Sequence, residues 1–360
     1  MEQIIHNTPN WLYEAAAFIS KQYTNYESLF MENHDKFGMT ENEMAEYMKR
    51  YTEYKEKVSS EIMPIYAEYP SLEKLFHSDN FDSEGNDSIA LSLVRSFGHN
   101  MTPSLNNDEI DHIISDFIPT IADNFALHVK EEEIVVNNIE DVLKLLDKAS
   151  IEDGDKMQIL NLYRNRYEII GKLSELLNLC AAVCQKHFPI IKEEFEKTIK
   201  FLNQAGDLED LIHSSIDIDI KISEKRDAYS SIFCFNGLSM VSLEDRFTVF
   251  IGIYFFDLDN LKNKNKFNDA QIVADLKALG DPTRLKIIHL LSKDNMYIQE
   301  LAEKLKLTPA TVSHHINVLL SSGFISITVD AEKAKKIYYK TNSEKFYSIS
   351  NIIKALADNI

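Results

Sequence analysis

The chain has 360 residues, which is enough for two or three domains with hydrophobic cores of their own. Its apolar content of 44%, with only ten glycines and eight prolines, is typical of a globular protein and excludes a largely disordered one. Three cysteines are too few for a disulfide framework and favour a reducing compartment. The sequence shows neither a secretion signal nor a membrane span, so we expect a cytoplasmic protein without a membrane partner.

Charge is distributed unevenly along the chain. Residues 268–360 contain 12 Lys and Arg against 10 Asp and Glu, whereas residues 1–267 contain 26 against 47, a net charge of −21. Phosphate repels so acidic a region, and any nucleic-acid contact is therefore expected in the C-terminal part. A solubilising surface explains the N-terminal charge equally well.

The fold class that the pattern predicts is mainly α with small β elements (α+β). Apolar residues at helical spacing in 1–78, 139–149 and 155–205 predict amphipathic helices, the last of them interrupted at Pro189. From residue 216 to 222, isoleucine alternates with charged residues, a period of two that indicates a half-buried strand.

Further strands are expected at 230–235 and 247–257, with a turn at Asn236 and Gly237. The sequence therefore predicts an acidic, mostly helical domain over 1–260 that ends in a small antiparallel sheet at about 215–258. The polar, basic stretch 261–268 is expected to be a linker, and 269–360 a second domain.

The second domain contains strong helix-start signals. Asp281 is expected to cap a helix that begins at Pro282, because proline suits the first position of a helix, and that carries Leu285, Ile288 and Leu291 on one stripe. A short helix over 298–305 follows. Thr308 is then expected to cap a third helix that begins with a proline and is stopped by Gly323.

The third helix has two distinct faces on a helical wheel. Val312, Ile316 and Leu319 form the stripe that we expect to be buried. The residues expected to face DNA are Thr308, Ala310, Thr311, Ser313, His314 and Asn317. They are short or polar and carry no fixed charge, as a helix that enters the major groove requires. His315 lies at the edge of the apolar stripe, and we interpret it as a packing residue.

Two strands at 324–330 and 336–340 are expected to form a hairpin after this helix. Its tip contains Lys333, Lys335 and Lys336. In isolation these lysines could simply be a solvated hairpin tip. Beside the helix pair they indicate a wing that contacts backbone phosphate or the minor groove.

These segments together resemble the ArsR-type winged helix-turn-helix regulators. The resemblance is carried by LKALGDPTRLKIIHLL at 276–291, by IQELAEKLKLTPATVSHHINVL at 298–319 and by a wing strand with two tyrosines. It implies a homodimeric repressor or activator, of which we expect a repressor. It also implies that the helix starting at Thr308 reads double-stranded DNA and that outer helices at about 270–279 and 343–357 form the dimer contact.

Many members of that family sense metals. Arsenic and cadmium sensors place a Cys-x-Cys pair in the helix before the recognition helix, where 296–301 here contains no cysteine. Zinc sensors place histidines in the last helix, and 343–360 contains none. We therefore expect neither a metal at these positions nor a cofactor.

Elsewhere, Cys180, Cys184 and His187 have the spacing of a helical thiol site for a soft metal or for oxidation sensing. They share their helical face with leucines, however, which favours core packing.

No catalytic signature is present, and we do not expect an enzyme. Asp217 and Asp219 form a pair on the predicted strand, but alternate residues of a half-buried strand ordinarily just face water. The principal hypothesis is a sequence-specific DNA-binding regulator whose first domain senses an unknown small molecule or protein effector. The alternatives are a protein-interaction module that uses the winged helix mainly for dimerisation and, less favoured, an enzyme fused to a regulator.

Overall fold

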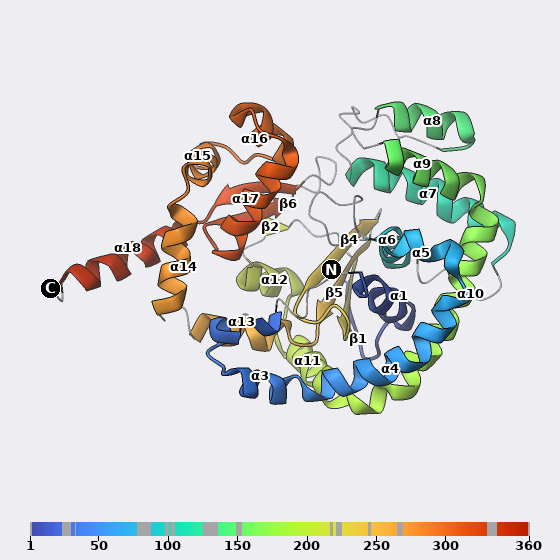
Figure 1. The fold of residues 1–360 in the computed structure, drawn as a ribbon, viewed down its shortest axis with the longest axis horizontal. Coiled ribbons are helices and arrows are strands. Elements are labelled where there is room, and N and C mark those ends of the chain that lie inside the picture. Colours follow the sequence, from blue (N-terminus) through green and yellow to red (C-terminus); the bar gives the residue numbers. More distant parts are fainter. Residues whose placement is uncertain are drawn as a thin grey trace. The chain divides into compact units, whose positions relative to one another are not determined.

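The computed structural model describes most of the chain, which divides into two compact units (Figure 1). The described residues are 2–23, 30–32, 34–77, 88–97, 101, 105–124, 136–148, 153–216, 219–220, 225–243, 246–264, 269–329 and 337–358. Unit 1 comprises Met1–Asn33, Thr40–Ala205 and Ser223–Phe256, and unit 2 comprises His34–Met39, Gly206–Ile222 and Asp257–Ile360. The borders differ from the expected division at 261–268, because two earlier segments belong to the C-terminal unit.

The expected linker is wrong in its first half. Residues 261–264 continue helix α13 (Phe255–Lys264), and residues 265–268 lie outside the described part of the chain. A polar, lysine-rich composition is compatible with an exposed helix as well as with a loop, so composition alone did not separate the two.

Unit 1 is mainly helical, in agreement with the spacing of its apolar residues. Its helices are α1 (Trp11–Lys21), α3 (Glu41–Tyr47), α4 (Lys49–Ala67), α5 (Glu73–Phe76), α6 (Ile89–Phe97), α7 (Asn107–Asn124), α8 (Ile139–Lys148), α9 (Asp153–Arg164), α10 (Arg166–His187) and α11 (Lys192–Gln204). The 3-10 helices η2 (Pro70–Leu72) and η4 (Phe188–Ile190) precede α5 and α11. The second contains Pro189, where the break was expected. Within the described residues, no helix is long and apolar enough to cross a membrane.

The sheet of unit 1 is mostly parallel. Its described strands are β1 (Glu2–His6), β3 (Lys225–Ser231), β4 (Leu238–Leu243) and β5 (Arg246–Gly252). In the order β1-β3-β5-β4, the pairs β1·β3 and β3·β5 are parallel and β4·β5 is antiparallel. The expected antiparallel sheet is therefore wrong, because alternation reveals a buried face but not the direction of the neighbouring strand.

Two expected strands differ from the described ones. In the described part of 216–222, Ile216 ends α12 (Leu208–Ile216), and Asp219 and Ile220 form strand β2 (Asp219–Ile220), which belongs to unit 2. The last residues of the expected strand 247–257 leave the sheet, because α13 begins at Phe255. In these places tertiary partners override the local pattern.

Aromatic rings form a ladder across the parallel strands. His6, Tyr229 and Phe250 are partners in the strand registers, with ring centroids 3.9 Å apart for the first pair and 5.2 Å for the second. Tyr13 of α1 stacks on Phe250 at 3.7 Å. Stacked rings on registered positions stabilise strand pairing and fix the register, so the ladder holds α1 to the sheet.

Asp227 is a buried charged residue on the central part of this sheet. Its carboxylate accepts a hydrogen bond from His6 of β1, at 2.8 Å, and pairs with Arg246 of β5. Because a buried carboxylate is costly unless it is paired, this contact ties both parallel neighbours to β3.

A second buried carboxyl, that of Glu14 on α1, holds the chain where it leaves β3. Glu14 is 0% exposed and accepts hydrogen bonds from the backbone N–H groups of Ile232, at 3.1 Å, and Phe233, at 2.9 Å. Burial raises the pKa of Glu14 to about 7, although the backbone hydrogen bonds and Ser231 act in the opposite direction. The segment after β3 is thus anchored to α1 by a carboxyl group that titrates near neutrality.

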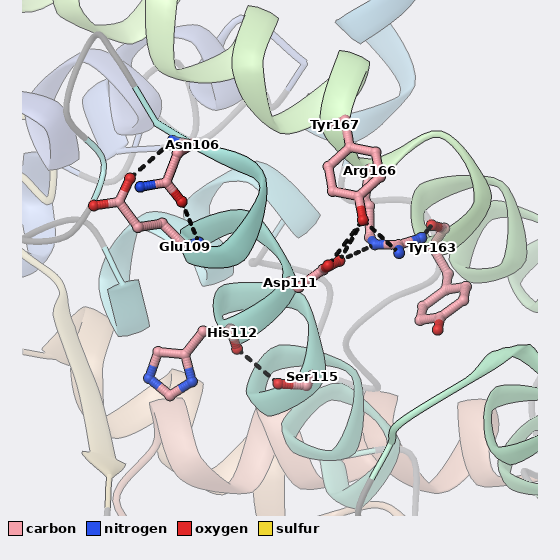
Figure 2. Close-up of polar contacts among 8 residues, drawn as sticks. All are labelled: Asn106, Glu109, Asp111, His112, Ser115, Tyr163, Arg166 and Tyr167. Carbon is pink, nitrogen blue, oxygen red and sulfur yellow. Dashed lines mark hydrogen bonds and ion pairs between the residues drawn. The ribbon is translucent and has the colours of Figure 1, made fainter.

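Helix α10 runs alongside α4 and α1, and α7, α8 and α9 gather at one end of unit 1 (Figure 1). Figure 2 shows how α7 is tied to the start of α10. The Arg166 guanidinium lies 4.7 Å from the ring centroid of Tyr163 and 4.4 Å from that of Tyr167, and it pairs with Asp111. The Tyr167 hydroxyl also donates to Asp111, at 2.8 Å, so one carboxylate holds both groups.

Unit 2 contains a winged helix-turn-helix. Its described helices are η1 (His34–Phe37), α12, α13, α14 (Asp269–Leu279), α15 (Pro282–Leu291), α16 (Ile298–Leu305), α17 (Pro309–Ser321) and α18 (Ser343–Asp358), and its further strands are β6 (Ile325–Val329) and β7 (Ile337–Thr341). Buried residues of α15, α16, α17, β6 and β7 share one hydrophobic core. The helix start expected at Pro282 and the helix expected over 298–305 agree with these bounds.

The sheet of the wing contains more than the expected hairpin. Strands β6 and β7 pair antiparallel, and an isolated bridge joins Met296 to Tyr339 of β7. On the other side of β6, strand β2 pairs in parallel, with Asp219 opposite Thr328. A segment that lies before β3 in the sequence therefore covers the β6 edge, which explains why residues 206–222 belong to unit 2.

The Glu14 contact predicts a pH-dependent stability of the chain. Between about pH 4.5 and 7 the folded protein retains a proton that the unfolded chain has released, so the free energy of unfolding falls as the pH rises. The expected fall from this group is roughly 3 kcal/mol at most. Urea unfolding across this range should show a weaker pH dependence for Glu14→Gln. An equally steep profile for Glu14→Gln and wild type would contradict the assignment.

Candidate nucleic-acid interface

Helix α17 begins as its sequence predicts. The Thr308 Oγ1 accepts a hydrogen bond from the Thr311 backbone N–H at 3.2 Å, and Pro309 occupies the first helical position. Below this cap the residues expected to be buried, Val312, Ile316 and Leu319, are each 0% exposed. The apolar stripe therefore fixes which face of the helix is turned outward.

The outward face carries most of the residues expected to contact DNA. Those exposed are Thr308, Ala310, Thr311, His314 and Asn317. Ser313 is different, because it is only 6% exposed and belongs to the buried side of the helix. Its expected position was wrong, since Ser313 lies roughly 60° from Ile316 around the helix and falls inside the buried arc.

The turn between α16 and α17 contains two cations that the sequence analysis did not single out. Lys304 lies in the last turn of α16, and Lys306 ends that helix in the left-handed region, with φ of 57°. Both are exposed. Their position just before the α17 N-terminus was readable from the sequence, since the turn itself was expected there. They add positive charge beside the exposed face of α17.

The DPTR sequence at 281–284 forms a junction between helices. The Asp281 Oδ1 accepts from the backbone N–H groups of Thr283, at 2.8 Å, and Arg284, at 2.9 Å, which caps α15. The Arg284 guanidinium donates to the carbonyl oxygens of Ala278, at 2.6 Å, and Lys277, at 2.8 Å, and so caps the end of α14. Two side chains of one motif thus satisfy orphan groups at both helix ends.

His315 lies on the inner side of α17, next to the same junction. Its side chain is 15% exposed, and its Nδ1 is 3.8 Å from the Asp281 Oδ1. This position agrees with its interpretation as a packing residue at the edge of the apolar stripe. His314, one residue earlier, is exposed, so adjacent histidines differ in their exposure.

The tip of the wing lies outside the described residues. Lys333, Lys335 and Lys336 fall in the segment 330–336 between β6 and β7. Their contact with phosphate stays a prediction.

The comparisons with known proteins concern this C-terminal region. Residues 281–326 match the family model of bacterial regulatory proteins of the arsR family. The transcriptional repressor SdpR of Bacillus subtilis is 39% identical over 67 residues, which cover 19% of this chain and 71% of that protein. An uncharacterized HTH-type transcriptional regulator of Methanocaldococcus jannaschii is 35% identical over 85 residues, covering 23% of this chain and 88% of that protein.

The chain belongs to the ArsR family. The crystal structure of NolR from Sinorhizobium fredii is 33% identical and covers 26% of this chain and 89% of that chain, with a TM-score of 0.20. The match of residues 281–326 includes the Asp281 junction and all of α17, so the predicted resemblance is confirmed where its motifs lie. The relatives over this region are transcriptional regulators.

The outer helices of this ArsR-family chain are α14 and α18. They are joined by an ion pair in which the Lys345 Nζ lies 2.6 Å from the Asp275 Oδ2. Asp275 is 1% exposed, so a buried carboxylate on α14 is paired with a lysine on α18. Each helix also exposes large apolar side chains, which are Val273 and Leu276 on α14 and Tyr347 and Ile353 on α18.

The two cysteines of the expected thiol site lie in the core of unit 1. Cys180 and Cys184 are both 0% exposed, and burial raises the pKa of the Cys180 thiol to about 12. The His187 Nε2 donates a hydrogen bond to the Glu61 carboxylate at 2.7 Å. These observations favour the packing interpretation over a thiol sensor, because a metal ligand or redox-active cysteine needs an accessible thiolate. The described residues contain no group of His, Cys, Asp and Glu that could hold a metal ion.

The Asp281 cap generates a prediction about stability. We expect Asp281→Ala to lower the free energy of unfolding by about 1–2 kcal/mol, because two backbone donors lose their acceptor. Asp281→Asn should cost only a few tenths of a kcal/mol, since asparagine caps equally well. Urea unfolding measures both. Asp294→Ala removes an exposed carboxylate from the same unit and is the control. Equal losses for Asp281→Ala and Asp294→Ala would show that the cap contributes nothing.

Proposed function

We propose that this protein is a sequence-specific regulator of transcription, acting as a repressor, that reads duplex DNA with the exposed face of α17. The observation that carries the proposal is that α17 has one buried face and one exposed face. Val312, Ile316 and Leu319 are 0% exposed, whereas Thr311, His314 and Asn317 are exposed. The matching relatives are transcriptional regulators, and SdpR is named a repressor.

The exposed side chains suit the major groove. A hydroxyl, an imidazole and an amide are short groups that can donate to or accept from base edges. Lys304 and Lys306 at the preceding turn, together with the wing lysines, would supply sequence-independent phosphate contacts. The acidic charge of residues 1–267 keeps DNA away from the rest of the chain.

A homodimer completes the proposal. The apolar side chains on the outer helices are 49% exposed for Val273, 43% for Leu276, 72% for Tyr347 and 47% for Ile353. Apolar residues of this size on neighbouring helices are suited to burial against a second copy. A dimer would present two copies of α17 to successive major grooves about 34 Å apart.

We further propose that unit 1 serves as a non-enzymatic effector or partner domain and that the protein works in the cytoplasm. Its buried carboxyl groups Glu14 and Asp227 bind backbone N–H groups and neighbouring strands, which is a structural role. The chain passes from unit 1 into the segment whose strand β2 pairs with β6 of the wing. This pairing supports a regulatory connection to the DNA-binding unit.

Direct readout predicts a loss of specificity on truncation of the exposed face. A duplex of about 30 base pairs, selected in vitro from a random pool by the full-length protein, serves as the probe. On this duplex, His314→Ala and Asn317→Ala should each weaken binding by about 1–3 kcal/mol while leaving binding to random duplex nearly unchanged. Fluorescence anisotropy measures both affinities.

The matched control is His289→Ala, which removes an exposed histidine from α15 and should leave both affinities unchanged. If wild type and His314→Ala bind selected and random duplex alike, α17 does not read bases. That outcome would favour the alternative function, a protein-interaction module with weak affinity for DNA.

The dimer is tested on the outer helices. We expect wild type to sediment as a dimer at micromolar concentration and the double variant Leu276→Glu, Ile353→Glu to sediment as a monomer, because each charge would be buried against the second copy. Leu143→Glu on α8 is the control, since Leu143 is 44% exposed but lies in unit 1. A wild-type monomer, or a variant that still forms the dimer, would contradict this interface.

A further inference from the structure

The inner side of α17 carries a histidine whose contact with α15 is incomplete. The His315 Nδ1 is 3.8 Å from the Asp281 Oδ1, which is beyond hydrogen-bond distance. Among the residues that the structure describes, this buried nitrogen has no hydrogen-bond partner. A buried polar atom without a hydrogen-bond partner destabilises the folded protein. A change that gives this nitrogen a hydrogen-bond partner is therefore favoured.

The carboxylate opposite this nitrogen stays charged. The backbone N–H groups of Arg284 and Thr283 donate to Asp281 and hold the pKa of that carboxyl below its usual range, against the opposing effect of desolvation. A neutral imidazole presents at Nδ1 either a lone pair, which a carboxylate repels, or an N–H group without a net charge on the ring, depending on the tautomer. A protonated imidazole presents an N–H, which the carboxylate attracts.

We propose that His315 is a positioning residue of the recognition helix, and that its protonation joins α17 to the Asp281 cap and strengthens DNA binding as the pH falls. The inference rests on the proposed function of α17 as the helix that reads DNA. It adds that pH regulates this helix through His315, a side chain that does not itself face the DNA.

Other charged groups beside this pair do not supply the same contact. Arg284 of α15 acts electrostatically on Asp281, but its guanidinium donates to the carbonyl oxygens of Ala278 and Lys277 at the end of α14. His314 of α17 has its ring centroid 5.9 Å from that of His315 and is exposed. A proton on His315 is therefore the change that acts on the α15–α17 contact, whereas a proton on His314 acts on DNA directly.

The geometry makes the position of α17 sensitive to this contact. His315 and the DNA-facing residues His314 and Asn317 lie within one turn of each other on the same rigid helix. Closing the gap between His315 and Asp281 therefore moves or immobilises the reading face relative to α15. Readout of base edges depends on hydrogen-bond distances, so a shift of a few tenths of an ångström matters.

The test is a double-mutant cycle on DNA affinity. Binding to the duplex recovered by in vitro selection is measured at about pH 6 and pH 8 for wild type, His315→Gln, Asp281→Asn and the double variant. Asparagine preserves the α15 cap while removing the charge. We expect the two substitutions to be coupled by about five- to tenfold in affinity at the lower pH and by less than about twofold at the higher pH.

A control separates the two histidines. His314→Gln should weaken binding at both pH values but leave the coupling between positions 315 and 281 intact. A coupling that is absent at the lower pH, or equal at both, overturns the inference. So does a coupling that disappears in His314→Gln, because the pH dependence would then belong to the DNA-facing ring.

A second measurement does not depend on DNA binding. It is hydrogen exchange of the α17 amides in the full-length protein without DNA, corrected for intrinsic exchange rates. Protection should rise at the lower pH in wild type and not in His315→Gln or Asp281→Asn. If this change is seen but no duplex is bound at either pH, the proposed function fails and the proton-dependent contact stands. If DNA is bound specifically while protection does not change, the inference fails and the proposed function stands.

Discussion

The Asp281 carboxylate accepts two backbone hydrogen bonds at the start of α15, and α14, α15 and α17 meet around it. Arg284, held in the same turn, satisfies carbonyl groups at the end of α14. Helix α17 therefore lies against the cap of α15, and buried residues of α15, α16 and α17 share one hydrophobic core. A helix cap usually acts only within its own helix, but here its carboxylate also faces a side chain of α17.

The C-terminal unit could be predicted closely because its signals are local. Asp281 and Thr308 cap helices whose prolines stand at the first position, and each cap lies within three residues of its partners. Side-chain burial was less predictable. The wheel placed Ser313 at the flank of the outer face, yet a helix packed on both α15 and α16 buries a wider arc than a single stripe suggests.

For unit 1, the sequence predicted only that the region is acidic and mostly helical. Strand β1 pairs with β3 across more than two hundred residues, and no local pattern encodes that partner. Glu14 is the clearest example, because a glutamate on an amphipathic helix ordinarily faces water. Its burial follows from the unpaired N–H groups of Ile232 and Phe233, which need an acceptor where the chain leaves β3. Such a need appears only once the tertiary neighbours are known.

Both units use carboxyl groups to hold backbone, but with different consequences. In unit 1, Glu14 is enclosed in the core, and its titration changes stability without reaching the surface. In unit 2, Asp281 is half-buried and faces a histidine on a helix whose other side is exposed. A proton exchanged there alters the contact that positions exposed side chains. The same kind of interaction is therefore structural in one unit and suited to control in the other, and the difference lies in what stands opposite the carboxylate.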